Sequence, residues 1–251
     1  MPVHGDAFAE GQRTRWDLID LPEPRVVRRE GRTCYGVAKV AGDFCCALAL
    51  LVLTAPLTLL AALAIKLTSR GPVLYSQTRL GRGGRPYKIY KLRTMYHNCE
   101  QQSGARWSTD GDPRVTPVGR FLRRTHIDEL PQLWNVLRGD MSLVGPRPEQ
   151  IDFVVRLEAS VPFYQRRHLI RPGLTGWAQV RCGYAGSDES SAWKLCNDLY
   201  YVKYRSLGLD LLVLIETVGL VLLGPSTASR IPLTPWAEPD PIADAATRVI
   251  P

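Results

Sequence analysis

The chain has 251 residues and a formal net charge of +8, and 45% of its residues are hydrophobic. This length and apolar content suffice for one sizeable domain with a buried core, plus tails. The six cysteines show no C-x-x-C spacing. That pattern argues against a disulfide framework or a zinc site, and for reduced thiols in a cytoplasmic setting.

Positive charge is concentrated in two stretches that lack acidic residues. No Asp or Glu occurs between Asp43 and Glu100, and residues 66–93 carry eight Lys or Arg. The second stretch, between Glu158 and Asp188, contains four arginines. Such regions attract the phosphates of lipids, nucleotides or nucleic acids, although a solvated basic face has the same composition. No helix-turn-helix, RNP or zinc pattern is present, so we do not expect a nucleic-acid partner.

The two ends of the chain differ in composition from its middle. Residues 1–36 are polar, charged and proline-bearing, and they lack the apolar region of a signal peptide, so we expect a variable, disordered arm. Residues 224–251 are proline-rich and indicate a loose tail. The folded domain is therefore expected over residues 37–223.

Residues 44–65 form an uncharged run of 22 residues between Asp43 and Lys66. The run is long enough to cross the hydrocarbon of a bilayer, and only Thr54 and Thr58 interrupt its apolar character. Pro56, near its middle, predicts a bend. We therefore expect a membrane helix.

The charges around this helix do not orient it across a membrane. Five basic residues precede the run and five follow it: Arg25, Arg28, Arg29, Arg32 and Lys39, then Lys66, Arg70, Arg79, Arg82 and Arg85. Because positive flanks favour the cytoplasm, a helix that enters and leaves by the same face suits both ends. The sequence therefore favours a re-entrant helix broken at Pro56, with simple spanning as the alternative.

Beyond this segment the pattern predicts a small β-hairpin and several helices. Residues 73–79 and 87–93 read as strands around a glycine-rich turn at 81–84, and residues 118–124 as a short basic helix. Residues 207–223 are strongly apolar but include Asp210 and Glu216, which favours a helix packed on the core or lying at the membrane interface over a second span. Three tyrosines before it suit either a membrane-interface belt or a core: Tyr200, Tyr201 and Tyr204. The expected fold class is α+β, mostly helical, in which a compact catalytic domain carries a small β-hairpin, interfacial amphipathic helices and one N-terminal re-entrant membrane helix.

Residues 128–148 contain the most informative pattern. An apolar stripe with helical spacing is formed by Leu130, Leu133, Trp134 and Leu137. Pro131 is tolerated only in the first turn of a helix, so the helix should begin at about Asp128, and Gly139 should end it. Asp128 and Glu129 then lie together at a helix N-terminus, followed by Arg147 between two prolines. A structural alternative is that Asp128 caps the helix while Glu129 interacts with its dipole.

A carboxylate pair among arginines can also carry chemistry. A carboxylate attacks phosphorus once a divalent cation screens the charge of the substrate, and Mg²⁺ prefers one or two carboxylates plus substrate phosphate oxygens. The residues alone therefore indicate a basic membrane-surface protein that handles a phosphorylated substrate.

Several strings of the chain resemble the bacterial sugar transferase family, the monotopic polyprenyl-phosphate phosphoglycosyl transferases. The resemblance covers residues 37–223 and is carried by residues 39–43, 65–72, 90–95, 112–116, 125–133, 135–137, 139–148, 171–180 and 198–202. It implies transfer of a sugar 1-phosphate from a UDP-sugar to undecaprenyl phosphate, with Mg²⁺ and a covalent aspartyl-phosphosugar intermediate, at the start of exopolysaccharide or other cell-surface glycan synthesis. It also implies a location on the cytoplasmic face of the bacterial inner membrane.

The resemblance assigns roles to individual residues. Asp128 is implied as the nucleophile and Glu129 as the metal-associated residue, while Arg147 is implied to bind phosphate. Arg123 matches a basic residue near the nucleophile, and Lys91 and Arg93 fall in a basic motif that we include among the substrate-binding candidates.

The chain departs from the family at the membrane helix, and some properties stay open. Ala55 precedes Pro56 where the family often has serine, and we expect the Thr54 hydroxyl to bond a carbonyl that the proline frees. A catalytically idle membrane adaptor of a glycan-assembly complex is the alternative to the transferase. The sequence does not indicate which UDP-sugar, glycan pathway or oligomeric state applies.

Overall fold

The long apolar run folds as one helix, α3 (Cys34–Thr68), which is longer at both ends than the predicted membrane segment. Thr33 caps its start by accepting a hydrogen bond from the Gly36 amide, and the Ser69 amide donates to the Ile65 carbonyl at its end. In the most apolar 18-residue stretch of α3, only 11% is buried against the rest of the protein. The prediction of a long apolar N-terminal helix is therefore confirmed.

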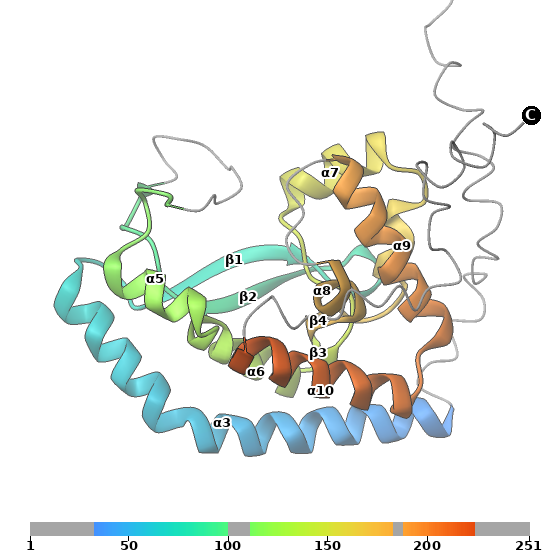
Figure 1. Cartoon of the computed structure of the whole chain (residues 1–251), viewed down its shortest axis with the longest axis horizontal. Helices are drawn as coiled ribbons and strands as arrows, with labels where there is room; N and C mark the ends of the chain where they lie inside the picture. Colours follow the sequence, from blue (N-terminus) through green and yellow to red (C-terminus); the bar gives the residue numbers. More distant parts are fainter. Residues whose placement is uncertain (1–32, 100–110, 183–187, 224–251) are drawn as a thin grey trace, which may run out of the picture.

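Helix α3 bends along its length (Figure 1), and it contains Pro56. Proline has no amide hydrogen, so the carbonyl four residues earlier, that of Val52, loses its helical partner. The Thr54 hydroxyl instead donates to the Leu50 carbonyl at 2.7 Å, and the Thr58 hydroxyl donates to the Thr54 carbonyl at 2.9 Å. The expectation that Thr54 bonds the freed carbonyl was therefore wrong.

The structure, a computed structural model, describes residues 33–99, 111–182 and 188–223. The predicted tail over 224–251 and all but the last four residues of the predicted arm lie outside these ranges. After α3 the elements follow in the order β1 (Leu74–Leu80), η2 (Arg82–Gly84), β2 (Pro86–Leu92), α5 (Pro117–Arg124), η3 (Ile127–Gln132), α6 (Leu133–Leu137), β3 (Ser142–Val144), α7 (Ile151–Ser160), η4 (Tyr164–Leu169), β4 (Gly173–Thr175), α8 (Trp177–Cys182), α9 (Asp188–Tyr204) and α10 (Leu207–Leu223). The described part is mostly helical, as expected.

Strands β1 and β2 form the predicted antiparallel hairpin, each within one residue of its expected bounds. The register runs from Leu74 opposite Leu92 to Leu80 opposite Pro86. Gly83 and Gly84 in the turn have φ of 66° and 71°, a region that glycine adopts without strain. The sequence signal for this turn was therefore sufficient to place both strands.

A second, parallel pair of strands, β3 and β4, was not predicted. Gly145, Gly173 and Gly176 allow the two backbones to approach closely: a Cβ at Gly173 would lie 2.1 Å from the Gly145 nitrogen. A Cβ at Gly176 would lie 2.1 Å from the Gly145 carbonyl oxygen. These glycines therefore fix the segment that leads directly into Arg147.

The central core is built around α6, β3, α8 and α9, and includes Leu133, Val144, Trp177 and Tyr201. Trp134, predicted on the apolar stripe of the same helix as Leu133, is 51% exposed. Of the tyrosines before α10, Tyr201 belongs to the core at 1% exposed, whereas Tyr204 is 47% exposed.

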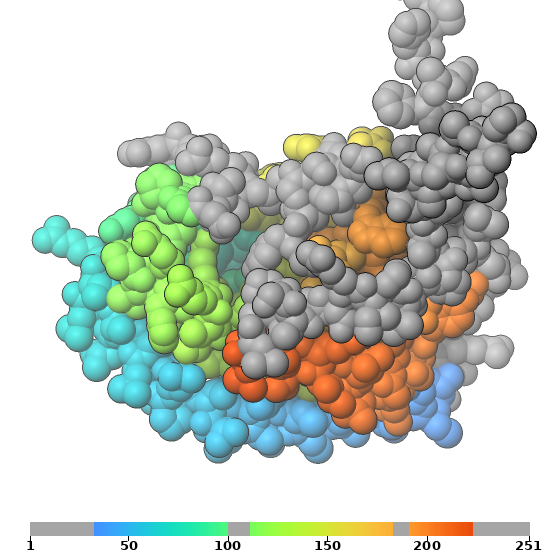
Figure 2. Space-filling view, in the orientation of Figure 1, coloured from blue at the N-terminus to red at the C-terminus, as the bar shows by residue number. Residues whose placement is uncertain are grey.

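Helix α10 packs on the core through one side and exposes apolar residues on another. Val213 is fully buried, whereas Leu211 and Ile215 are about three-fifths exposed. Asp210 is buried and accepts hydrogen bonds from Tyr35 and Lys39, so α10 is tied to the start of α3. The two helices lie along the same side of the molecule (Figures 1 and 2).

Candidate active site

Asp128 and Glu129 lie in the first turn of η3, as the sequence predicted, but the turn differs from the expected α-helix. Residues Ile127–Gln132 form a 3₁₀ helix that contains Pro131, and α6 continues it for one turn. His126, in the left-handed region with φ of 57°, precedes η3 without a side-chain capping bond. Asp128 is therefore not the helix cap. The chain turns away after α6 at Gly139, which has φ of 79°.

Glu129 is held between two cations. Its Oε1 accepts from Lys91 Nζ and Arg147 Nη2, both at 2.7 Å, and its Oε2 faces Arg147 Nη1 at 3.4 Å. Only 12% of the Glu129 side chain is exposed. Burial alone would raise the pKa of Glu129, but Arg147 and Lys91 together outweigh burial and hold the pKa well below its usual range. Glu129 is therefore ionised throughout the neutral range.

The adjacent Asp128 has the opposite electrostatic character. The residue is 7% exposed, and among the described residues none donates a hydrogen bond to its carboxylate or forms an ion pair with it. Burial and the neighbouring Glu129 charge raise the pKa of Asp128 to about 6, against the opposing effects of Lys91, Arg123 and Arg147. Asp128 is thus a desolvated carboxylate, uncommitted to any partner but surrounded by cations.

Strand β2 and helix α6 set the position of the pair through Asn135, a fully buried residue. Its side-chain oxygen accepts from the Tyr90 amide at 3.2 Å, and its side-chain nitrogen donates to the Lys88 carbonyl at 2.7 Å. Asn135 therefore joins α6 to the edge of β2 just before Lys91, which then reaches Glu129. Sequence reasoning did not single out Asn135, because its partners lie about 45 residues away in the chain.

Arg123 is positioned by the docking of α5 against the end of β2. Its Nε donates to the Thr94 hydroxyl at 2.8 Å. The Thr94 carbonyl in turn accepts from the Thr116 amide at 3.0 Å, where Thr116 caps α5. Gly119 permits the approach, because a Cβ there would lie 2.0 Å from the Thr94 carbonyl oxygen.

Arg147 is held through its backbone as well as its side chain. Its carbonyl accepts from Arg167 Nη2 at 2.8 Å, and Arg167 forms a buried ion pair with Asp198 at 2.7 Å. The preceding Pro146 carbonyl accepts from the Gly173 amide at 2.9 Å. The arginine between two prolines is therefore braced by β4 and by the η4–α9 ion pair.

A cavity of about 60 Å³ lies beside Lys91 and Arg147, the two cations that hold Glu129. It is lined by Arg79, Ile89, Lys91, Gln132, Arg147, Pro148 and Glu149. Within the described residues, the buried Arg79 Nε and Gln132 Nε2 have no hydrogen-bond partner. Unpartnered buried donors on residues that line a cavity suit an anionic ligand there. Sequence reasoning missed both residues, although Arg79 lies in the acid-free basic stretch.

Arg93, another of the predicted substrate-binding residues, contacts the end of α3. Its Nη2 donates to the Ser69 carbonyl and hydroxyl, both at 2.8 Å, so the guanidinium fastens the end of α3 to β2. The structure therefore gathers Lys91, Arg123 and Arg147 around Asp128 and Glu129, and it shows Arg93 in contact with Ser69.

The donor set suits a Mg²⁺ ion shared with a substrate better than one held by protein alone. No group of three or more His, Cys, Asp or Glu within the described ranges could hold a metal. Glu129 Oε2, however, has only its long contact to Arg147, and Asp128 is uncommitted. One or two carboxylates completed by substrate oxygens and water are the usual protein share of a Mg²⁺ site.

These features define a class: a protein with one long exposed apolar helix and a basic, carboxylate-bearing site suited to phosphate groups. Comparison with known proteins makes the class specific. The model of the bacterial sugar transferase family matches residues 34–224. The chain belongs to this family.

Several curated relatives are similar to the chain over most of its length. A UDP-N-acetylgalactosamine-undecaprenyl-phosphate N-acetylgalactosaminephosphotransferase from Aeromonas hydrophila is 48% identical over 190 residues, covering 76% of the chain and 45% of that relative. A UDP-glucose:undecaprenyl-phosphate glucose-1-phosphate transferase from Caulobacter vibrioides is 48% identical over 193 residues, 76% of the chain and 72% of the relative. The exopolysaccharide production protein PSS from Rhizobium leguminosarum is 44% identical over 188 residues, 72% of the chain and 94% of the relative. The chain thus spans less than half of the Aeromonas protein and nearly all of the Rhizobium protein.

Proposed function

We propose that this protein transfers a sugar 1-phosphate from a UDP-sugar to undecaprenyl phosphate, at the start of exopolysaccharide or other cell-surface glycan synthesis. The observation that carries the proposal is the division of roles between two adjacent carboxylates. Glu129 is held by Lys91 and Arg147, while Asp128 beside it is buried near cations and has no hydrogen-bond or ion-pair partner among the described residues. The names of the Aeromonas and Caulobacter relatives state this class of transfer.

In the proposed reaction an Asp128 carboxylate oxygen attacks the phosphorus that bears the sugar. A bond forms between that oxygen and phosphorus, the bond to the UMP oxygen breaks, and UMP leaves with the electron pair. An oxygen of undecaprenyl phosphate then attacks the same phosphorus and displaces the Asp128 carboxylate. Each step exchanges one phosphorus–oxygen bond for another, and the nucleophile is regenerated.

The cations around the pair support this chemistry. Arg147 can grip two phosphate oxygens with its planar guanidinium, and Lys91 and Arg123 add positive charge where the phosphate would lie. Arg79 Nε and Gln132 Nε2 offer two further donors in the adjoining cavity. A raised pKa also favours attack, because a more basic carboxylate is the stronger nucleophile while it is still mostly ionised at pH 7.

We also propose Mg²⁺ as the cofactor, held by Glu129 together with substrate oxygens and water. The ion would screen the negative charge of the diphosphate. The residues of this chain would orient the substrate around it.

The membrane arrangement is part of the proposal. We propose that α3 is re-entrant with its bend at Pro56, that α10 lies at the interface, and that the catalytic body faces the cytoplasm from the inner membrane. The exposed apolar residues of α3 and α10 lie on one side of the molecule, which supports a single membrane-facing surface (Figure 2).

A UMP-release assay tests the function and separates it from the idle-adaptor alternative. Purified protein with Mg²⁺, undecaprenyl phosphate and a panel of UDP-sugars should release UMP with at least one of them. Asp128→Asn should abolish release, and Asp152→Asn, an exposed carboxylate on α7, should leave release unchanged. Absence of UMP release from folded wild type with every sugar would support the adaptor, and release by folded Asp128→Asn would exclude Asp128 as nucleophile.

A further inference from the structure

The cavity beside Lys91 and Arg147, called the Gln132 cavity below, is lined by two residues with unpartnered donors. Gln132 is 2% exposed, and its Nε2 has no hydrogen-bond partner among the described residues. Arg79 donates through Nη2 to Gln77 at 2.8 Å, but its buried Nε likewise has no partner there. Buried polar groups are normally hydrogen-bonded, so these two donors indicate a ligand that accepts hydrogen bonds.

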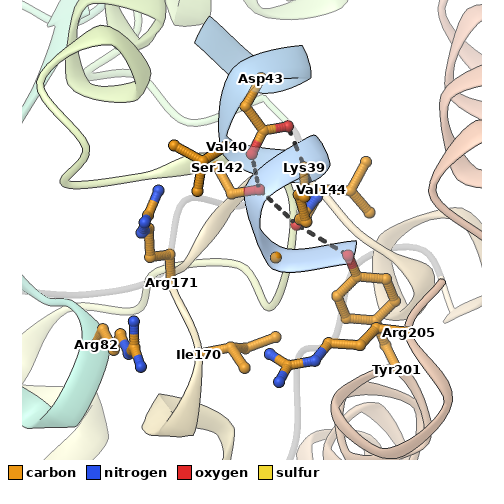
Figure 3. Close-up of a pocket in the computed structure, with 11 residues that line it drawn as sticks. Lys39, Val40, Asp43, Arg82, Ser142, Val144, Ile170, Arg171, Tyr201 and Arg205 are labelled. Carbon is orange, nitrogen blue, oxygen red and sulfur yellow. Dashed lines mark hydrogen bonds and ion pairs between the residues drawn. The ribbon is translucent and has the colours of Figure 1, made fainter. Parts of the chain in front are cut away.

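A second cavity, of about 40 Å³ at the start of α3, gives no such signal. The Ser142 hydroxyl donates to Asp43 at 2.6 Å, and Lys39 Nζ lies 3.7 Å from Asp43 (Figure 3). The Tyr201 hydroxyl donates to the Val144 carbonyl at 3.2 Å. Within the described ranges, no residue that lines this second cavity has a buried side-chain nitrogen or oxygen without a partner. The unpartnered donors therefore distinguish the Gln132 cavity.

The geometry of η3 connects Gln132 to the carboxylate pair. One turn of a 3₁₀ helix takes three residues, so side chains three positions apart lie on the same face. Gln132, the last residue of η3, therefore shares a face with Glu129. Lys91 and Arg147 each lie 2.7 Å from Glu129, and both also line the Gln132 cavity. The same two cations thus border Glu129 and this cavity.

The size and place of the cavity suit the second phosphate of a UDP-sugar. One water needs about 10–15 Å³, so the cavity accommodates about four to six water-sized groups, enough for a phosphate but not for a nucleoside. Asp128, proposed to attack the phosphorus that bears the sugar, does not line it. The two phosphates of a diphosphate share one oxygen, so the second lies directly beside the one at Asp128. That second phosphate is the one that leaves as part of UMP.

The carboxylate in the lining has its own cation. Glu149 Oε1 accepts from Lys194 Nζ at 2.8 Å, and Lys194 offsets its charge. An ionised phosphate oxygen accepts hydrogen bonds and donates none, so its partners in this cavity are the N–H groups. Hydrogen bonds of this kind, with one charged partner, are stronger than bonds between neutral groups.

We propose that Gln132 and Arg79 bind the phosphate of the leaving UMP in the Gln132 cavity. The inference rests on the proposed transfer reaction and adds two residues to it. The last torsion of a glutamine side chain is soft, so Nε2 of Gln132 turns toward a phosphate oxygen at little cost. When the bond from the attacked phosphorus to the bridging oxygen breaks, that oxygen keeps the electron pair, and UMP gains one negative charge. Donors placed where this charge develops stabilise the transition state.

The test measures UMP binding by isothermal titration calorimetry, with the full-length protein in a neutral detergent and a fixed concentration of Mg²⁺. Gln132→Met keeps the length of the side chain but removes the donor. It should weaken UMP binding by about tenfold or more, since a hydrogen bond to a charged group is lost. Uridine, titrated as a competitor of UMP, lacks the phosphate and should bind this variant and wild type alike. Gln165→Met, at an exposed position on η4, is the control and should bind UMP like wild type.

Unchanged UMP binding by folded Gln132→Met, or no UMP binding by wild type, would overturn the proposal. An equal loss of UMP and uridine binding would place the nucleoside in the cavity and overturn it as well. If Gln132→Met does not fold, Arg79→Lys, which keeps the charge but lacks the Nε donor, must weaken UMP binding. Arg85→Lys, at an exposed position after the hairpin turn, must then bind like wild type. Protein that binds UMP through Gln132 but releases none from any UDP-sugar would retain this site and contradict only the proposed transfer.

Discussion

At the residue scale, the central feature is that two neighbouring carboxylates acquire opposite properties from their surroundings. Glu129 is paired with two cations, Lys91 and Arg147, and its pKa falls. Asp128 receives burial and the Glu129 charge, and its pKa rises to about 6. The surroundings alone therefore make Glu129 a permanently charged partner of the cations and Asp128 a candidate nucleophile. Other enzymes divide the roles of two carboxylates in the same way.

Because the pKa of Asp128 is raised, we predict that the rate of UMP release falls as the pH is lowered from 7 to 5. The carboxylate is about one tenth ionised at pH 5 and about nine tenths at pH 7, so the single-turnover rate should rise about tenfold between them. Glu129→Gln removes a negative neighbour and should move the midpoint to lower pH. A pH–rate profile that is flat from pH 5 to 7 would contradict the assignment.

The guanidinium of Arg147 is planar and can donate to two oxygens at once, so we predict that lysine cannot replace it. Arg147 contacts both oxygens of Glu129 and is proposed to grip two phosphate oxygens. Arg147→Lys should therefore lower kcat/KM by about 100-fold, nearly as much as Arg147→Ala. Arg120→Lys, an exposed position on α5, serves as the control. Full activity of Arg147→Lys would show that a point charge suffices.

At the element scale, close backbone contacts position the short helices and strands more than their own helix or strand propensity does. Helix α5 docks on the end of β2 through Gly119, and β3 meets β4 through Gly145, Gly173 and Gly176. These contacts bring Arg123 and Arg147 to the carboxylate pair. Small residues in these places are therefore part of the site even though they touch no substrate.

Gly119→Ala tests this role. The new Cβ would lie 2.0 Å from the Thr94 carbonyl oxygen, a backbone atom that cannot move alone, so α5 must shift. We expect the free energy of unfolding to fall by about 2 kcal/mol or more. Activity should also fall, because Arg123 loses its hydrogen bond to the Thr94 hydroxyl. Gly208→Ala, where no atom lies within 4 Å of the new Cβ, should unfold like wild type in thermal denaturation followed by circular dichroism. Equal melting of the two variants would show that α5 docks otherwise.

The sequence predicted the elements that have a local signal in the chain. The glycine-rich turn placed the hairpin, and the short basic helix predicted over residues 118–124 is α5, which begins one residue earlier. The parallel β3–β4 pair was missed because each strand has three residues and its partner lies about 30 residues away. Within the site, the Asp-Glu pair and Arg147 stood out in one motif. Arg79, Gln132 and Asn135 did not, because their roles arise only when the β1–β2 hairpin packs against η3 and α6.

At the scale of the whole molecule, α3 and α10, which expose many apolar residues, lie along one side of the molecule (Figure 1). The bend of α3 and the basic residues on both sides of its apolar run favour a helix that returns to the same face. The proposed transfer to a lipid acceptor requires that the active site lies close to the membrane surface.

Reporter cysteines test the topology. Asp20→Cys and Asp240→Cys, each in a background without the native cysteines, should both resist a membrane-impermeant reagent in intact cells and react after lysis. Pro56→Leu should straighten α3, expose the Asp20→Cys site in a fraction of molecules and lower activity in proportion. Labelling of the Asp20→Cys site alone in intact cells, with Pro56 in place, would show that α3 spans the bilayer.

The central claim is that Asp128 carries the sugar phosphate during turnover, and the covalent species itself is the most direct evidence. Wild-type protein incubated with Mg²⁺ and a UDP-sugar that it uses, without undecaprenyl phosphate, should be quenched in acid and digested for mass spectrometry. We predict the mass of one sugar phosphate on the peptide that contains Asp128, lost when undecaprenyl phosphate is added before the quench and absent in Asp128→Asn. UMP release accompanied by the adduct on another residue, or by no adduct at any time point, would contradict the account.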